Sequence, residues 1–215
     1  MLAPQDSSSM GSPRLFLYRM MRAARLDGHI FISLRDDGSA TGQSLLVLAL
    51  AGLSFGFGFA ASVGGDLIGV LVGSVAGMAV GVLVGFVWLS LTYLVATRLF
   101  KGTSSYWGLA RPLFFATSSA LVFLLMSIPA WPIPDLARPL GVGWTAVSSV
   151  FAVKNAMGFD TQRSLVTFII VAFAMLIIYG FLPPSRSSRR ILGPRSTVRI
   201  EVSWSGLGLG WSCTC

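Results

Sequence analysis

Residues 65–85, GDLIGVLVGSVAGMAVGVLVG, carry a glycine at every fourth position. The glycines of this ridge are Gly65, Gly69, Gly73, Gly77, Gly81 and Gly85. No charged residue occurs between residues 67 and 97, which is long enough for a transmembrane helix. In water each interior glycine would destabilise a helix by about 1 kcal/mol relative to alanine. In a bilayer the same glycines let another helix backbone approach closely, so we expect a spanning helix that packs through its glycine ridge.

The glycine ridge does not run straight along the helix. Residues four apart advance by about 400°, so the ridge drifts by about 40° per step and by about 200° from residue 65 to residue 85. One straight partner would follow about three of these glycines. The remaining glycines would then face another helix, from this chain or from a second copy. The ridge therefore predicts at least two neighbours for this helix.

The composition is that of an integral membrane protein. Of 215 residues, 54% are hydrophobic and 11% are charged, and the mean hydropathy is +0.76, which is too apolar for a soluble domain of this size. The formal net charge is +8, but the charged residues gather between apolar runs. Membrane topology and anionic lipid explain that placement better than nucleic acid, which we do not expect as a partner.

The apolar runs predict an all-α polytopic bundle of five spans. We place the spans at residues 44–62, 67–100, 113–128, 139–157 and 165–182. The first span has small residues of its own, Gly52, Gly56 and Gly58, and residues 63–66 link it to the second span. Because short links join antiparallel neighbours, we expect these two spans to pack on each other through glycine.

The fourth span is the shortest, and the loop before it is rich in proline. Only 15 residues separate Arg138 from Lys154. A re-entrant segment buried among the other helices is the alternative to a full crossing. Prolines at positions 129, 132, 134 and 139 predict an extended loop between the third and fourth spans.

The N-terminal region predicts an amphipathic helix on the membrane surface. Residues 1–12 read as a disordered leader, and residues 13–43 as an interfacial segment. Around a helix beginning at residue 13, four arginines fall within an arc of about 140°, opposite an apolar face. They are Arg14, Arg19, Arg22 and Arg25. We expect them to meet anionic lipid. The alternative is a helix that packs on the protein's own loops.

The tail, residues 184–215, is basic and rich in serine and glycine. Within it, residues 198–204 alternate apolar and polar side chains, as in a half-buried strand. A lone strand is not stable, so this segment either docks on another protein or belongs to a loose tail.

The charges favour a cytoplasmic N-terminus under the positive-inside rule. With five spans, the basic residues of the cytoplasmic segments are Arg14, Arg19, Arg22, Arg25, Arg35, Arg98, Lys101, Arg111, Lys154 and Arg163. The short outer loops carry only Arg138. The five arginines of the tail then lie outside, against the rule. Four spans would bring them inside but would place Lys154 and Arg163 outside, so we favour five.

We expect no catalytic, cofactor-binding or metal-binding residues. No ionisable residue lies in the middle of a span, where proton relays and transporters place them. Cys213 and Cys215 lie at the C-terminus, far along the chain from His29, and this suggests neither a metal site nor a nucleophilic pair.

Two segments carry a resemblance to a known family. The first is YLVATRLFKGTSSYWGLARPLFFATSSALVFLLMSIPAWPIP, and the second is GVGWTAVSSVFAVKNAMGFDTQRSLVTFIIVAFAML. The basic Lys101-Gly102 linker, Tyr106 and Pro112 before the third span, and Trp144 at the start of the fourth resemble the core of the Yip family. The resemblance covers about residues 51–181 and implies five spans with a cytoplasmic N-terminus.

Eukaryotic Yip proteins interact with Rab-type GTPases, and the resemblance therefore implies a small GTPase as partner only if this chain is eukaryotic. The chain lacks the Asp-Leu-Tyr-Gly-Pro motif of those trafficking members, and its length suits a prokaryotic member. We expect the cytoplasmic membrane as its location, with the Golgi or endoplasmic reticulum as the alternative.

These observations together predict a membrane protein without enzymatic activity. We expect a scaffold or membrane-organising partner that acts through glycine-mediated helix packing, as a homo-oligomer or with another membrane protein. A channel or transporter subunit with a pore between glycine helices is one alternative. An accessory subunit of a larger membrane complex is the other.

Overall fold

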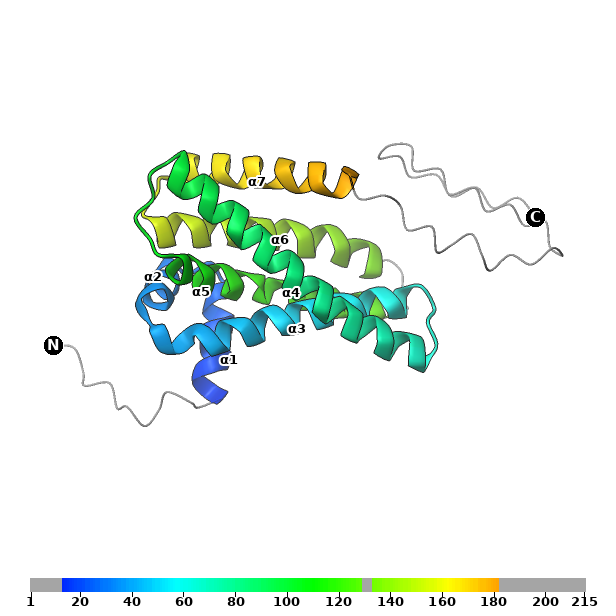
Figure 1. Cartoon of the computed structure of the whole chain (residues 1–215). Helices are drawn as coiled ribbons and strands as arrows, with labels where there is room; N and C mark the ends of the chain where they lie inside the picture. The colour runs from blue at the N-terminus through cyan, green and yellow to red at the C-terminus, as the bar shows by residue number, and fades with distance from the viewer. Residues whose placement is uncertain (1–12, 129–132, 182–215) are drawn as a thin grey trace. The chain divides into compact units, whose positions relative to one another are not determined.

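The computed structural model describes residues 13–128 and 133–181, and within these ranges the chain is helical with no β-strand (Figure 1). Five helical segments are long and apolar enough to cross a membrane: Gly38–Ser62, Leu67–Arg98, Tyr106–Ser127, Ile133–Met157 and Thr161–Gly180. The expected all-α polytopic bundle with five spans is confirmed. The leader, the tail and the strand expected at residues 198–204 lie outside the described residues.

The first two spans form an antiparallel helical hairpin, α3 (Thr41–Ser62) and α4 (Leu67–Arg98). Asp66 caps α4 by accepting a hydrogen bond of 2.8 Å from the backbone nitrogen of Gly69. Gly64 has φ +75° in the connecting turn, a conformation that glycine adopts without strain. The 32 residues of α4 are a single helix of about 48 Å, longer than a hydrocarbon core of about 30 Å.

The third span begins earlier than predicted and changes its helical type. It consists of α5 (Tyr106–Ala116) followed by the 3-10 helix η3 (Thr117–Ser127), whereas the sequence predicted residues 113–128. Ser105 caps α5 by accepting a 3.0 Å hydrogen bond from the nitrogen of Gly108, and Pro112 is accommodated inside the helix. We had read Pro112 as a boundary, but a proline inside a membrane helix is tolerated where neighbouring groups satisfy the freed carbonyl.

The fourth span is a complete helix, α6 (Ile133–Met157), and not a short re-entrant segment. The predicted start at residue 139 and the expected extended conformation of Pro134 and Pro139 are wrong. Pro134 lies in the first helical turn, where no intrahelical bond needs its missing N–H, and Asp135 in the same turn suits the helix dipole. The last span is α7 (Thr161–Phe181), four residues longer at its start than predicted.

The N-terminal segment contains two helices where we predicted one. The amphipathic helix is α1 (Pro13–Ala24), and in Figure 1 it runs across the direction of the spans. A second helix, α2 (Gly28–Asp36), follows, and the 3-10 turn η2 (Gly38–Ala40) leads into α3. Asp27 caps α2 by accepting a 3.0 Å hydrogen bond from the backbone nitrogen of His29.

The main core lies where α1 and α2 meet the spans. Its largest fully buried side chains include Phe31 and Leu34 of α2 and Phe114 and Phe115 of α5. Residues 30, 31 and 34 have the apolar spacing of one face of a helix, and all three are buried. The helices α1 and α2 therefore belong to the bundle and share its main core with the spans.

Candidate functional site

The α3–α4 seam joins the two helices backbone against backbone. A Cβ atom on Gly52 would lie 2.8 Å from the carbonyl oxygen of Gly77, and one on Gly81 would lie 2.7 Å from the Cα of Gly52. A Cβ on Gly56 would collide with the carbonyl of Gly73. Because these neighbours are backbone atoms, they cannot rotate away from an added side chain. Glycine is therefore the residue that fits at the centre of this seam.

Four of the six ridge glycines face α3. They meet it in the order Gly73 at Ala60, Gly77 at Gly56, Gly81 at Gly52 and Gly85 at Leu48. One helix, α3, therefore meets four of the ridge glycines, one more than the three that we expected of a single partner. The contact positions on α3 also step by four residues, so both rows drift by the same angle, and two crossed helices keep such rows together.

The first two glycines of the ridge have another environment. A Cβ on Gly69 would lie 2.7 Å from the capping carboxylate of Asp66, and one on Gly65 would lie 2.9 Å from the carbonyl oxygen of Ala60. Both belong to the turn and the start of α4. The helical part of the ridge thus has four members, and the remaining two serve the turn and the cap.

A second close contact lies on another face of α3. A Cβ on Gly58 would collide with the carbonyl oxygen of Phe123 in η3, and a Cβ on Gly141 of α6 would lie 2.7 Å from the ring of Phe123. Phe123 is thus held between two glycines from different spans. We had noted Gly58 only as one of several small residues and had missed Gly141, which has no glycine periodicity around it. The helix approached by backbone from two sides is α3.

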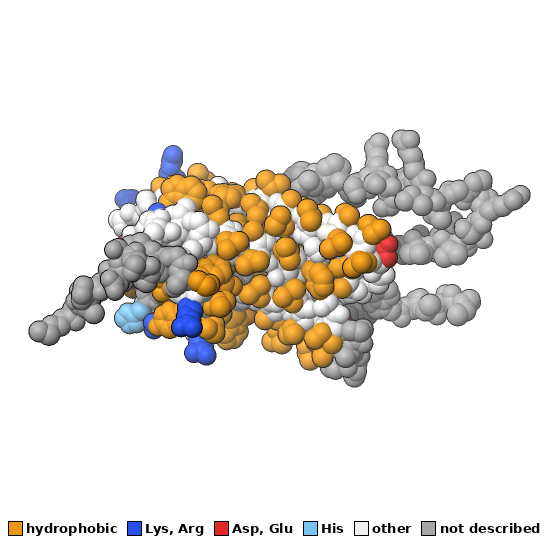
Figure 2. Space-filling view, turned by 90° about the horizontal axis from the view of Figure 1, so that it is seen from below, with side chains coloured by type: hydrophobic (Ala, Val, Ile, Leu, Met, Phe, Trp, Pro, Cys, Tyr) orange, Lys and Arg blue, Asp and Glu red, His pale blue; other side chains and the backbone are white. Residues whose placement is uncertain are grey.

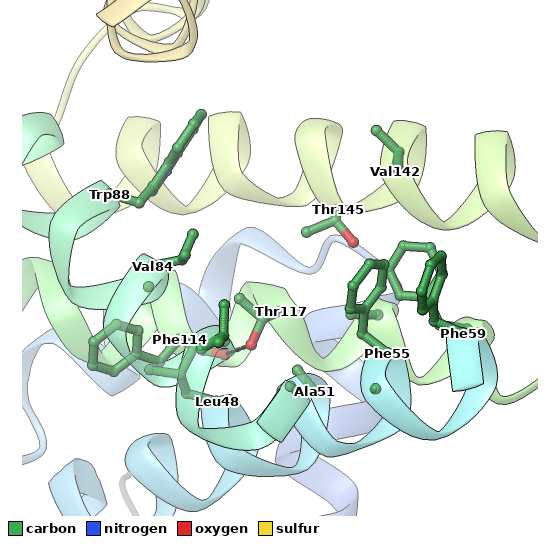
Figure 3. A pocket seen from close by; sticks show the side chains of 18 of the residues that line it. Leu48, Ala51, Phe55, Phe59, Val84, Trp88, Phe114, Thr117, Val142 and Thr145 are labelled. Carbon is green, nitrogen blue, oxygen red and sulfur yellow. Dashed lines mark hydrogen bonds between the residues drawn. The ribbon is translucent and has the colours of Figure 1, made fainter. Parts of the chain in front are cut away.

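Beside the seam lies an open cavity of about 720 Å³, lined by residues of all five spans (Figure 3). Leu48, Ala51, Phe55 and Phe59 of α3 line one wall, and Val84 and Trp88 of α4 another. Phe114 and Thr117 come from the third span, and Val142 and Thr145 from α6. Phe168 and Tyr179 of α7 complete the lining. Its volume lies in the range of about 300–1,000 Å³ that is typical of ligand sites.

Three hydroxyl side chains in the wall of the cavity bond to nearby backbone. Thr117 donates to the carbonyl oxygen of Phe114 at 2.7 Å, and Thr145 to that of Gly141 at 2.7 Å. Ser149 donates to the carbonyl of Thr145 at 2.8 Å. No ionisable side chain other than the phenol of Tyr179 is among the described lining residues. The cavity is therefore suited to an apolar molecule and not to an ion.

The predicted arginine face of α1 is divided between the protein and the solvent. Arg19 points inward, with 14% of its side chain exposed, and donates to Asp37 at 2.6 Å and to Gln43 at 3.1 Å. Arg22 forms an ion pair with Asp27 and donates to the hydroxyl of Tyr18 at 2.8 Å. Arg14 and Arg25 are exposed. The placement of Arg19 in a common outer arc was wrong, because we had not foreseen a carboxylate behind α1.

The apolar face of α1 is used inside the protein. Phe16 packs edge-on against Phe115 with ring centroids 6.4 Å apart, and Met20 and Ala23 are buried. Leu17, Tyr18 and Met21 are exposed. The alternative of a helix packed on its own protein thus describes the inner face of α1, while its outer face carries three apolar side chains between arginines.

Asp37 connects α1 to the beginning of the first span. Burial would raise the pKa of its carboxyl, but hydrogen bonds from Ser39 and Arg19 and the charge of Arg19 outweigh burial and hold the pKa below its usual value. The same carboxylate accepts the backbone nitrogen of Ser39 at 3.0 Å and so caps η2. Asp37 is therefore charged at neutral pH, where it both pairs with Arg19 and caps η2.

Arg111 makes two hydrogen bonds that the sequence did not indicate. Its Nε donates to the hydroxyl of Thr41 at 2.9 Å, and its Nη1 donates to the carbonyl oxygen of Arg35 at 3.0 Å. The side chain thereby ties α5 to α2 and to the start of α3. Within residues 13–128 and 133–181 there is no group of three or more His, Cys, Asp or Glu side chains that could hold a metal ion.

The model of the Yip1 domain matches residues 14–182, a range that includes all of α1 except its first residue, all of the seam and all of α7. The chain belongs to the Yip1 domain family. This Yip1 domain protein is therefore an integral membrane protein with five segments able to span the bilayer. No curated protein and no solved structure matches the chain.

Proposed function

We propose that this Yip1 domain protein is a non-enzymatic scaffold that organises membranes or membrane proteins. The observation that carries the proposal is that α4 has two different faces, one packed on α3 and one exposed. Its glycines are taken by α3, while Leu71, Val75 and Leu83 on the rest of its surface are 58%, 61% and 67% exposed. In a bilayer this surface meets lipid or the span of another protein or a second copy. The glycine seam supplies the rigid support for that surface.

We further propose that the N-terminus is cytoplasmic. The ends of the helices at Arg35, Arg98 and Lys154 lie at one end of the bundle, and Figure 2 shows basic side chains at that end and an acidic one at the other. The excess of Lys and Arg at one end supports that end as the cytoplasmic one. On that side, Arg14 and Arg25 beside Leu17 and Met21 suit anionic headgroups and the adjoining acyl region.

The cytoplasmic membrane is our proposed location, and the Golgi or endoplasmic reticulum is the alternative. A small GTPase follows from the family as a partner only in a eukaryotic setting. The absence of the Asp-Leu-Tyr-Gly-Pro motif speaks against that partner here.

The scaffold proposal is tested by native mass measurement and chemical crosslinking after extraction in mild detergent. A homo-oligomer or a copurifying membrane protein that crosslinks to α4 supports it. Substituting Leu71 and Val75 with alanine should weaken that association, whereas alanine at the exposed Ile177 of α7 is the matched control. A strict monomer without any copurifying protein would count against a scaffold.

A channel or transporter subunit is the second candidate, because the cavity reaches along the seam. Reconstitution into liposomes tests it by measuring the flux of ions and small solutes. A flux that disappears in Gly77→Leu while the helical content is retained would favour this function over the scaffold. The lack of charged lining residues supports the scaffold.

A further inference from the structure

We propose that the cavity beside the α3–α4 seam binds the acyl chains of a membrane phospholipid. The cavity lies within the spans, and its lining on α4 extends from Gly73 to Trp88. These 15 helical steps correspond to about 22 Å along the axis, so the site reaches through most of a hydrocarbon core of about 30 Å. This proposal concerns a site within the bundle and is separate from the outer surface of α4 on which the scaffold proposal rests.

The wall of the cavity decides the chemical class of its occupant. Its threonine and serine hydroxyls already donate to the carbonyl oxygens of Phe114, Gly141 and Thr145, and the phenol of Tyr179 lies at the exposed rim. A hydrophilic solute would leave its water without finding new partners, which is costly. Water itself does not fill apolar cavities of this kind. The remaining material at this depth of a membrane is hydrocarbon, which would supply the contacts that an empty cavity lacks.

The size of the cavity distinguishes an acyl chain from a partner helix. An alkyl chain about 4 Å across that reaches through one leaflet of about 15 Å takes up roughly 190 Å³. Two such chains fit within about 720 Å³. A spanning helix about 10 Å in diameter and about 30 Å long would need roughly 2,400 Å³. The cavity is therefore too small for a helix and large enough for one phospholipid's two chains.

The rim of the cavity includes exposed apolar residues of three spans. Val80 of α4, Val142 of α6 and Tyr179 of α7 line it, and more than half of each side chain is exposed. Such exposed apolar residues at the rim let a chain enter sideways from the membrane. The glycines of the seam make room on the opposite wall, because Gly52, Gly77 and Gly81 all contribute to the lining without a side chain.

The test is native mass spectrometry of the full chain after reconstitution in vesicles of phosphatidylethanolamine and phosphatidylglycerol and extraction in mild detergent. Ala146 lines the cavity, and its neighbour Val147 is exposed and does not line it. Ala146→Phe should fill the site and lower the retained phospholipid at least about fivefold relative to the unsubstituted protein. Val147→Phe adds similar bulk outside and should leave retention unchanged.

A second pair on the facing wall keeps the test valid if Ala146→Phe does not assemble. Ala76→Phe adds bulk at the lining, and Ala79→Phe adds the same bulk at an exposed position of α4 that does not line the cavity. Circular dichroism and elution volume establish that each variant is folded. The proposal is overturned if folded lining variants retain as much phospholipid as their controls, if the unsubstituted protein retains none, or if the retained mass is a peptide or a polar solute.

Discussion

Gly56 of α3 and Gly77 of α4 lie backbone against backbone, so that a Cβ atom on Gly77 would meet the Cα of Gly56 and lie 2.8 Å from its nitrogen. No side chain separates the two helices at this point. The packing of the hairpin therefore depends on two positions at which any other residue must push the backbones apart. In a membrane, where apolar surface alone does not drive helices together, this close approach supplies the dispersion contacts that hold them.

Alanine substitutions along the ridge should have graded effects. Gly77→Ala collides with backbone and should destabilise the protein by about 1–3 kcal/mol, whereas Gly85→Ala meets the flexible end of Leu48 and should cost less. Gly143 of α6 has nothing within 4 Å of its Cβ position, so Gly143→Ala should be neutral or slightly stabilising. Thermal unfolding in detergent measures the series. Equal effects at all three positions would show that helix propensity and not the seam determines them.

Asp37→Asn should lower the melting temperature at neutral pH. The variant can still cap η2, but it loses the charge that pairs with Arg19, at a cost of about 1 kcal/mol or a few degrees. Because the folded pKa of Asp37 is lowered, this contribution is complete above the unfolded pKa of about 3.9 and is lost as the pH falls through the folded pKa.

The melting temperatures of the unsubstituted protein and of Asp37→Asn should therefore differ at pH 7 and converge in strong acid. Melting curves at several pH values measure this. Asp36→Asn is the control, since Asp36 is an exposed neighbour paired with Arg35, and it should change little. A difference for Asp37→Asn that stays constant down to pH 2 would mean that the charge of Asp37 is not its source.

Arg14 and Arg25 should determine lipid preference, and Arg19 should determine stability. Replacing both exposed arginines with glutamine should weaken the preference for phosphatidylglycerol over phosphatidylcholine, by about fivefold for each arginine near the surface. Lipid copurified from mixed vesicles measures this. Arg19→Gln should lower the melting temperature and leave the preference nearly unchanged. If Arg19→Gln instead weakened the lipid preference without lowering the melting temperature, Arg19 would lie on the outer face of α1.

Cysteine labelling should place the two ends of the bundle on opposite sides of the membrane. In a background with Cys213→Ser and Cys215→Ser, Val63→Cys in the α3–α4 turn should react with an impermeant maleimide in intact cells. Thr103→Cys before α5 should react only after the cells are opened. Both positions are exposed in the fold. Labelling at Thr103→Cys but not Val63→Cys would reverse the proposed orientation.

The number of spans and the pairing of the first two were predictable, because each rests on a local property of the chain. A long uncharged run predicts a span, and a four-residue link leaves α3 and α4 no choice but to be neighbours. The starts of the third and fourth spans were misplaced because we treated Pro112, Pro134 and Pro139 as boundaries. Capping at Ser105 and the position of Pro134 in a first turn outweighed that signal.

The remaining features depend on how distant segments meet. The inward turn of Arg19 requires Asp37, and the fixed position of Phe123 requires Gly58 and Gly141 from two other spans. The cavity likewise arises from the spacing of five helices, which no periodicity along the chain encodes. The number of ridge glycines that one helix can meet was underestimated because the contact positions on the partner helix were taken to lie on a straight line. The contact positions on α3 are also spaced by four residues, so they wind around α3 as the glycines wind around α4.

The most direct test of the seam is a disulfide between Ala60→Cys and Gly73→Cys in the Cys213→Ser, Cys215→Ser background. A Cβ on Gly73 would lie 2.7 Å from that of Ala60, and a small shift gives the separation of about 3.5–4.5 Å that disulfides require. Ala60→Cys with Val75→Cys, which lies on the exposed side of α4, is the control pair. We predict rapid oxidation of the first pair within one chain, seen as a monomer of altered mobility, and none for the control. Disulfide-linked dimers, or no bond at all, would contradict a glycine seam between α3 and α4 of the same molecule.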